Sequence, residues 1–360
     1  MRRYINQLIV TILIALTGGL TSCDNLLNVE VHNSITNESY WESEGDVTGY
    51  LTGIHYRFRE VMNNTYFFED RGDAFEPGLE GSVSEAWSQV LTDTTNIERA
   101  IAEAYFFRAY TYFILVRMWG DVPIVLAPTE SDQSPLPARS PATQVINEVI
   151  LQDIAKALDK LPEEGFRNKN RVSKPLVYAA LTDILLWKAK VTDKKSEDLL
   201  QALAASDHVI NAGLSLEDFP KIHATDNKKN GEIIFALNYQ RDEKSDHYGS
   251  RLKARDIFVS SAVNVEEIAF AKSGARSVYA PSEKFMNSFP NPNDIRKYAS
   301  FIVAKNNKGE TIGIFDNKFR GTLHEDDRYW DNDHILYRLG EILLFRAEIY
   351  AAMGGSANLE

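Results

Sequence analysis

The chain has 360 residues, of which 44% are hydrophobic and 25% are charged, so it is long enough to bury a sizeable core and is not a disulfide-dependent mini-protein. Its 39 basic and 51 acidic residues give a net charge of −12, which argues against nucleic acid as a partner because phosphate neutralisation needs clustered cations. The single cysteine excludes a disulfide framework, a cysteine-rich zinc site and a dithiol redox motif.

The N-terminus has the anatomy of a signal peptide. Two arginines precede a short apolar run over residues 8–16, and glycines interrupt this run before it reaches the about 20 residues that a membrane-spanning helix needs. The segment Leu20-Thr21-Ser22-Cys23 places small residues before the only cysteine, which is typical of a bacterial lipobox. We therefore predict that residues 1–22 are a lipoprotein signal peptide, that Cys23 is lipidated, and that residues 23–39 are a tether to the membrane. The alternative is an ordinary secretory signal followed by a chance cysteine.

Apolar residues at spacings of three and four predict amphipathic helices along most of the remaining chain. The strongest helix is expected over residues 96–119, because Gly120 and Pro123 supply a C-cap glycine and a helix breaker. A short strand is expected at 232–237, inside a loop-rich region over residues 219–330. Further helices are predicted over residues 47–62, 142–161, 174–190, 197–211 and 334–353.

Two of these helices share a motif, E-x3-F-R-A-x2-Y, at identical spacing. Small alanines beside large aromatic residues are typical of paired helices in tetratricopeptide arrays. We therefore predict an all-α dominated fold of tetratricopeptide-like helical repeats, at about 96–213 and 334–353, with a loop-rich insertion that carries short strands. The last helix is expected to have an apolar face without a sequential partner. The matched residues are Glu103, Phe107, Arg108, Ala109 and Tyr112, and Glu341, Phe345, Arg346, Ala347 and Tyr350.

The segment from Ala102 to Tyr110, followed by Gly120-Asp121-Val122-Pro123, resembles the signature of the SusD/RagB family. The resemblance covers residues 40–360 as one SusD-like domain, apparently shortened between Trp87 and Ile101 and at the C-terminus. Other motifs follow in the family's order: the lipobox, Tyr40-Trp41-Glu42-Ser43-Glu44, the helix over 173–189, Asn293-Asp294-Ile295-Arg296 and Tyr337-Arg338-Leu339-Gly340-Glu341.

The resemblance implies a function that composition and periodicity do not give. Members of this family are outer-membrane lipoproteins of Bacteroidetes that bind glycans at the cell surface and sit as a lid on a SusC-like TonB-dependent transporter. The chain is therefore expected to be a lipid-anchored, surface-exposed protein that captures an oligosaccharide or polysaccharide and delivers it to such a transporter. The alternatives are a tetratricopeptide-type protein–protein scaffold without sugar binding, and a glycoside hydrolase.

In sugar recognition, aromatic rings pack against the apolar faces of the pyranose rings, and amide, carboxylate or guanidinium groups form hydrogen bonds with the sugar hydroxyls. For each candidate aromatic residue, the alternative is a ring that anchors the core or a loop. Three other tryptophans, Trp41, Trp119 and Trp187, lie on or beside predicted helices and are expected in the core. The candidates on loop-like sequence are Trp87, Tyr279, Tyr329 and Trp330, with Arg71, Asp73, Asn291 and Asn293 as polar neighbours.

No catalytic residue, metal site or cofactor is predicted. Glu103 and Glu341 are equivalent in the repeat, which favours structural roles over the paired carboxylates of glycoside hydrolysis. The acidic stretch 325–333 lacks the regular order of a calcium loop, so a solvated acidic loop is favoured over calcium binding. No H-E-x-x-H motif occurs, and the seven histidines are scattered at positions 32, 55, 208, 223, 247, 324 and 334.

Overall fold

The chain divides into two compact units, Met1–Asp46 and Val47–Glu360. The computed structural model describes only parts of the second unit, so the predicted signal peptide, Cys23 and the tether lie outside the described residues. Within the described ranges, no helix combines the length and apolar character that crossing a membrane requires. The described residues are 53–60, 62, 75–77, 97–126, 136–161, 165–166, 168–192, 195–243, 245–268, 270 and 274–354.

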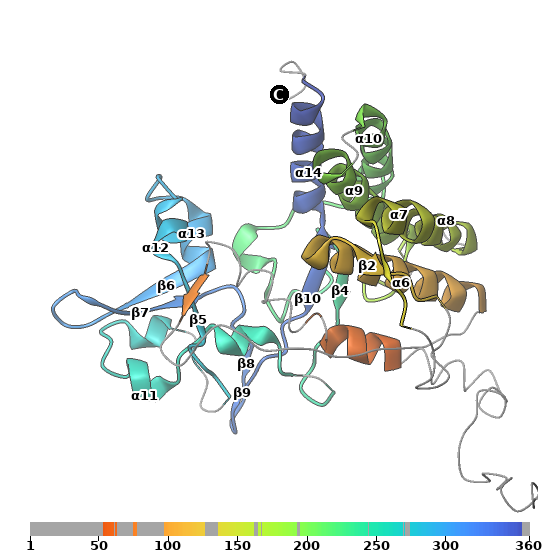
Figure 1. The fold of residues 1–360 in the computed structure, drawn as a ribbon. Coiled ribbons are helices and arrows are strands. Elements are labelled where there is room, and N and C mark those ends of the chain that lie inside the picture. Colours follow the sequence, from red (N-terminus) through yellow and green to blue (C-terminus); the bar gives the residue numbers. More distant parts are fainter. Residues whose placement is uncertain are drawn as a thin grey trace, which may run out of the picture. The chain divides into compact units, whose positions relative to one another are not determined.

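Helices dominate the fold and pack in pairs. Helix α6 (Ile97–Trp119) packs against α8 (Leu151–Lys160), and α9 (Lys174–Val191) packs against α10 (Ser196–Ile210) (Figure 1). Both predicted helix pairs are thus present. Residues 53–60 are also helical, within the helix predicted over 47–62.

Local sequence explains where these helices begin and end. Gly120 closes α6 with a φ of +70°, a value that glycine adopts without strain, and its N–H donates to Val116 O at 2.9 Å. Helix α9 begins after Ser173, whose Oγ accepts a hydrogen bond from Leu176 N at 3.5 Å, and Pro175 lies in the first turn.

The segment predicted as one helix over residues 142–161 contains a π-helical turn. It consists of α7 (Ala142–Val145), a π turn over Ile146–Ile150 and α8. The turn keeps Ile146, Val149 and Ile150 buried against α6. A pattern search at the α-helical period cannot detect such a turn, because the wider turn changes the spacing locally.

The last helix begins later than predicted. His334–Arg338 forms strand β10, which pairs antiparallel with β4 (Ile233–Leu237), and helix α14 follows at Leu339–Ala352. The prediction of a helix over residues 334–338 is therefore wrong. A distant strand pairs with His334, Ile335, Tyr337 and Arg338, and the apolar run from Ile335 to Tyr337 does not distinguish a buried strand from a helix.

Helix α14 packs against α9 and α10, so one face has a partner that is not its sequential neighbour. Leu339, Ile342 and Ile349 are buried there. Leu343 and Leu344 lie on another face and are 41% and 63% exposed. The expectation of an apolar face without a partner thus applies to part of the helix.

The arginines of the repeated motif make equivalent links. Arg108 Nε on α6 donates to Asp153 Oδ2 on α8 at 2.6 Å, and Arg346 Nη1 on α14 donates to Asp207 Oδ1 on α10 at 2.5 Å. In each case the arginine joins its own helix to the helix packed beside it. The repeat seen in the sequence therefore has the same structural role twice.

Among the described residues, the loop-rich region carries short helices and two hairpins around small clusters of buried side chains, and two further strand pairs include strands from outside residues 219–330. The short helices are η2 (Phe219–Lys221), η3 (Tyr248–Arg251), α11 (Asp256–Val259), η4 (Val265–Glu267), α12 (Glu283–Asn287) and α13 (Ile295–Ser300). The strand pairs are β1 (Phe75–Pro77) with β5 (Tyr279–Pro281), β2 (Val122–Pro123) with β3 (Arg139–Ser140), β6 (Phe301–Lys305) with β7 (Thr311–Asp316), and β8 (Thr322–Leu323) with β9 (Arg328–Tyr329).

The tryptophans expected in the core differ in their surroundings. Trp187 packs against the main core, with its ring edge-on to Phe113 at 6.0 Å between centroids. Trp119 is 43% exposed, contrary to expectation, because α6 ends at this residue. Trp41 lies outside the described residues.

Candidate functional site: a histidine pocket

A cavity of about 370 Å³ lies where the loop-rich region meets the junction between β10 and α14. We name it the histidine pocket, after five lining residues that form its aromatic wall: His223, His247, Tyr248, Phe319 and His334. Its volume falls within the roughly 300–1,000 Å³ typical of small-molecule sites. The lining also includes Lys318, Arg338, Glu341 and Leu344.

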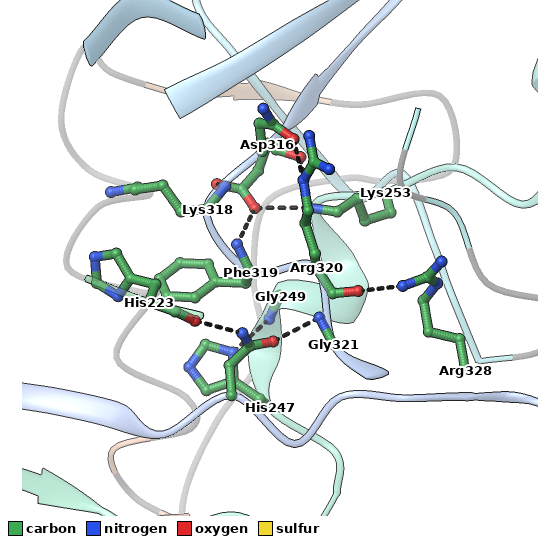
Figure 2. A network of polar contacts seen from close by, with 12 residues as sticks. His223, His247, Gly249, Lys253, Asp316, Lys318, Phe319, Arg320, Gly321 and Arg328 are labelled. Atoms are coloured by element: carbon green, nitrogen blue, oxygen red, sulfur yellow. Dashed lines mark hydrogen bonds and ion pairs between the residues drawn. The ribbon is translucent and has the colours of Figure 1, made fainter. Parts of the chain in front are cut away.

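The five rings of the wall form a connected series of contacts, and Figure 2 shows His223, His247 and Phe319 among them. The centroid of His247 lies 4.4 Å from that of Tyr248 and 4.6 Å from that of Phe319. His223 packs edge-on to Phe319 at 4.9 Å, and His334 lies 5.7 Å from both His247 and Tyr248. Residues far apart in the chain thus form one continuous aromatic surface.

The η3 turn holds His247 in place. The imidazole Nδ1 accepts a hydrogen bond from Gly249 N at 3.0 Å, which caps the turn. A Cβ on Gly249 would lie 2.5 Å from Cβ of Phe319, so only glycine allows the turn to approach the Phe319 ring this closely. This close approach brings His247 and Phe319 into contact.

Trp330 fixes the backbone on the other side of His247. His247 N donates to Trp330 O at 3.1 Å, and Trp330 N donates to Ser245 O at 3.0 Å. Trp330 is itself buried. Its backbone therefore positions a pocket residue, while its ring lies in the interior.

A buried ion pair shapes the turn that presents Lys318 and Phe319 (Figure 2). Lys253 is fully buried, and its Nζ lies 2.7 Å from Asp316 Oδ2, which also accepts from Phe319 N at 2.9 Å. Burial acts to raise the pKa of Asp316, but the charges of Lys253 and Lys318 outweigh it and lower this pKa below its usual range. The carboxylate thus stays ionised and holds the turn.

The three histidines of the pocket are neutral. Burial lowers the pKa of His223 to about 3 and that of His334 to about 4, and it holds the pKa of His247 well below the ordinary value of 6.5. Within the described ranges, His223 Nδ1, His247 Nε2 and His334 Nδ1 are buried without a hydrogen-bond partner. Each such atom costs about 1–3 kcal/mol unless water or a ligand pairs with it.

The tautomer of His247 follows from its hydrogen bond. Since Nδ1 accepts from Gly249 N, the proton of the neutral ring must be on Nε2. That Nε2–H is the buried donor without a partner among the described residues. It can donate to a hydroxyl or carboxylate oxygen of a ligand.

Charged side chains complete the lining. Arg338 is paired with the buried Glu232, whereas Lys318 makes no ion pair with any described residue. Burial, together with repulsion from Asp183, raises the pKa of Glu341 to about 7. Near neutral pH the pocket therefore carries two cations and one carboxylate that is only partly ionised.

Two of the candidate aromatic residues are buried. Tyr279 lies in β5 and packs with Tyr248 and Phe319, behind the pocket wall. Trp330 lies beside Ala275, and its indole Nε1 has no hydrogen-bond partner in the described part of the chain. Neither ring offers an open face to a sugar in this structure, because neighbouring side chains cover it.

Tyr329 lies in a separate polar cluster on the β8–β9 hairpin. Its hydroxyl donates to Asp326 Oδ2 at 2.7 Å, and Arg241 donates to the same oxygen at 3.0 Å. The Arg241 guanidinium lies 4.6 Å from the centroid of the Tyr329 ring, and His324 contacts the ring edge-on at 5.4 Å. Side chains of the protein therefore already occupy much of the surface around this ring.

The predicted amides lie away from the histidine pocket. Asn291 and Asn293 are exposed in the loop between α12 and α13, where Asn291 Oδ1 accepts from Asn293 N at 2.9 Å. Neither residue lines the pocket. The remaining candidates, Cys23, Arg71, Asp73 and Trp87, lie outside the described residues.

The carboxylates considered for acid–base or calcium chemistry have separate protein partners. Glu103 is buried and receives two hydrogen bonds from Arg171, at 2.9 and 3.0 Å, and lies 3.1 Å from His55 Nε2. In the acidic stretch, Asp331 accepts from Thr322 Oγ1 at 3.0 Å. In the part of the chain that the structure describes, no group of three or more histidine, cysteine or acidic side chains is arranged to hold a metal ion.

The sequence prediction missed the histidine pocket. His223, His247 and His334 show no motif spacing, and only the tertiary fold brings them together. The one local feature of the sequence that hints at the pocket is the aromatic pair His247-Tyr248, which is followed by Gly249 in loop-like sequence. That signal alone does not distinguish a pocket from a turn.

Comparisons with known proteins agree with this architecture. The SusD-like family model described as "Starch-binding associating with outer membrane" matches residues 83–186. SusD-like protein P38 of Formosa agariphila is 23% identical over 425 aligned residues, which cover 98% of this chain and 80% of that protein.

Solved structures share the fold. A SusD superfamily protein from Bacteroides vulgatus matches with a TM-score of 0.72 and 24% identity, over 88% of this chain and 77% of that one. Surface glycan-binding protein A from Bacteroides uniformis matches with a TM-score of 0.58 and 18% identity, over 73% of this chain and 57% of that one. Together with the helical repeats and the order of the motifs along the chain, these matches show that the chain is similar in sequence to SusD-like proteins and shares the fold of SusD superfamily structures.

Proposed function

We propose that this protein is a glycan-binding lipoprotein of the outer membrane and that the histidine pocket holds one sugar residue of the bound oligosaccharide. The observation that carries the proposal is the combination, in one cavity of about 370 Å³, of aromatic rings with three buried imidazole nitrogens that lack partners among the described residues. Rings pack against the C–H faces of a pyranose, and imidazoles exchange hydrogen bonds with its hydroxyls.

The family supports the same function. Its model is described as starch-binding and associated with the outer membrane, and one structural neighbour is named a surface glycan-binding protein. We extend this to a lipid anchor at Cys23, exposure at the cell surface and delivery of the glycan to a SusC-like TonB-dependent transporter. Capture of such a transporter without any affinity for saccharides would instead favour a protein–protein scaffold.

The proposed role is binding without catalysis. Glu103 is held by Arg171 and His55, so it is not placed to transfer a proton to a sugar. Glu341 lines the pocket, but no other carboxylate lines it with Glu341, whereas glycoside hydrolysis uses a pair. Release of reducing sugar that a Glu341→Gln substitution abolishes would contradict this part of the proposal.

The test is a titration of the full chain, purified in detergent, with soluble oligosaccharides from a panel of plant and bacterial polysaccharides. His223→Phe keeps a ring against Phe319 but removes both imidazole nitrogens. We expect it to weaken binding about tenfold, as for the loss of roughly 1.4 kcal/mol of hydrogen bonding. We also expect it to raise the melting temperature, because it removes a buried nitrogen without a partner.

The matched control is Tyr298→Ala, which removes an exposed ring from α13 outside the pocket. Its affinity should equal that of the unmodified chain. A folded protein that binds no member of the panel would contradict the proposed function. Equal affinities for the unmodified chain and His223→Phe would contradict the placement of the sugar in the histidine pocket.

A further inference from the structure

We propose that the histidine pocket is selective for an acidic sugar: it binds the carboxylate of a hexuronic acid residue, with Lys318 as the counter-ion and His247 Nε2–H as a hydrogen-bond donor. This inference rests on the proposed function and specifies the class of glycan.

The first argument is the charge of Lys318. This side chain lines the pocket, is only partly exposed and lies 5.6 Å from the centroid of the Phe319 ring. It makes no ion pair with any residue that the structure describes. The neighbouring carboxylate, Asp316, pairs with Lys253 and accepts from Phe319 N; the charge of Lys318 also lowers its pKa, but no ion pair joins these two side chains. Lys318 is therefore available to an external anion, and a carboxylate fits it better than a hydroxyl.

The second argument is the balance of charge around the cavity. Lys318 and Arg338 both line it and both lower the pKa of His223, whereas Asp316 raises that pKa and the charge of Arg338 is already paired with Glu232. Glu341 is the one acidic side chain in the lining, and burial raises its pKa to about 7. An incoming carboxylate therefore meets Lys318 as the one lining cation without an ion pair among the described residues, and the partly buried position of the pocket strengthens this attraction.

The third argument is the set of hydrogen-bonding groups. His247 presents an N–H donor that has no acceptor among the described residues, and a carboxylate oxygen is an acceptor with no competing proton. His223 Nδ1 and His334 Nδ1 remain for the ring hydroxyls. The rings of Tyr248 and Phe319 supply the apolar wall for the pyranose. One hexuronic acid residue satisfies all three features together.

The experiment compares two ligands that differ at C6: tetragalacturonate, which carries carboxylates there, and the neutral galactotetraose of the same linkage, which carries hydroxymethyl groups. Each is titrated calorimetrically into the full chain, into Lys318→Gln and into Lys308→Gln, at pH 7 and fixed ionic strength. Lys308 is the matched control, because it is an exposed lysine on the β6–β7 turn outside the pocket.

We expect the unmodified chain and Lys308→Gln to bind tetragalacturonate at least about tenfold more tightly than galactotetraose. Lys318→Gln should lose most of this preference and keep its affinity for the neutral ligand. In long-range ¹H–¹⁵N spectra, tetragalacturonate should shift the Nε2–H signal of His247 in the unmodified chain, which ties the preference to the pocket.

Three results would overturn one or both proposals in distinguishable ways. Equal affinity for the two ligands, or an unchanged preference in Lys318→Gln, overturns acid selectivity and leaves glycan binding intact. Binding of free galacturonate without binding of any oligosaccharide overturns glycan capture and supports the anionic pocket. No binding of any saccharide by a folded chain overturns both.

Discussion

At the scale of single residues, the histidine pocket contrasts with the buried polar groups beside it. Lys253 and Asp316 form a complete ion pair, whereas three imidazole nitrogens a short distance away have no partner among the described residues. A fold selected for stability alone would pair or remove such atoms, because each costs about 1–3 kcal/mol. The contrast shows where, among the described residues, buried imidazole nitrogens are left without partners at a cost in stability.

The buried carboxyl of Glu341, another residue of the pocket, makes the stability of the protein depend on pH. Burial raises its pKa from 4.5 to about 7. Below pH 4.5 the carboxyl is protonated in both the folded and the unfolded chain, so it carries no penalty. Between these two values only the unfolded chain releases the proton, so stability falls as the pH rises, and above pH 7 the full penalty applies. Glu341→Gln should therefore stabilise the protein by about 1–3 kcal/mol at pH 8 and have little effect at pH 4.5.

Urea unfolding of the unmodified protein and of Glu341→Gln, at pH 4.5 and at pH 8, measures this difference in stability. Glu348→Gln is the control, because Glu348 lies on the same helix but is exposed and paired only with the exposed Lys190. It should change stability by less than about 1 kcal/mol at either pH. Equal stabilisation by Glu341→Gln at pH 4.5 and pH 8 would show that its carboxyl does not titrate as described.

At the scale of elements, the contact between α9 and α10 contains an ion pair whose contribution can be measured. Lys188 and Asp198 are both buried, with Nζ–Oδ distances of 2.9 Å. Lys190, two residues later on α9, pairs with Glu348 where both side chains are about half exposed. Lys188→Met leaves a buried carboxylate without its ammonium and should destabilise the fold by about 3–5 kcal/mol. Lys190→Met should cost less than about 1 kcal/mol.

Chemical denaturation of the two variants checks this prediction, because both remove one lysine charge from the same helix. If Lys188→Met and Lys190→Met unfold at the same denaturant concentration, the buried pair does not hold α9 against α10. A double variant, Lys188→Met with Asp198→Leu, should recover much of the loss, because an apolar pair of similar size replaces the buried ions.

The sequence predicts the helices well, because their stability depends on local periodicity and on caps such as Ser173 and Gly120. It does not predict β10, because the partner strand β4 lies far away in the chain and the run from Ile335 to Tyr337 is apolar throughout. The same limit applies to the pocket. His223, His247 and His334 meet only after β4 has paired with β10 and the η3 turn has packed on Phe319.

At the scale of the whole second unit, the pocket joins two kinds of structure. His223, His247 and Phe319 belong to the loop-rich region, whereas Glu341 and Leu344 belong to α14, which packs on the helical repeats. A ligand that contacts both sets stabilises them together, since it binds only the folded arrangement. Bound oligosaccharide should therefore slow amide hydrogen exchange both in η3 and in the first turns of α14.

Hydrogen–deuterium exchange with mass spectrometry, with and without saturating oligosaccharide, measures this effect. Peptides from α10 that do not line the pocket serve as the internal reference. At a ligand concentration of 100 times Kd, linkage predicts up to about 2.7 kcal/mol of added protection for amides whose exchange requires the pocket to open, whereas amides of α10 that exchange by local opening should be unchanged. Protection confined to the loop-rich region would mean that the ligand does not contact α14.

The turn that carries Lys318 is held by residues outside the helical repeats. Asp316 and Lys253 hold this turn from within the loop-rich region, and no residue of the helical repeats takes part in that ion pair. A substitution at position 318 can thus invert or remove a charge in the pocket while the repeats fold as before. The charge of the pocket can therefore change without a change in the helical repeats, even though Arg338 and Glu341 of its lining belong to β10 and α14.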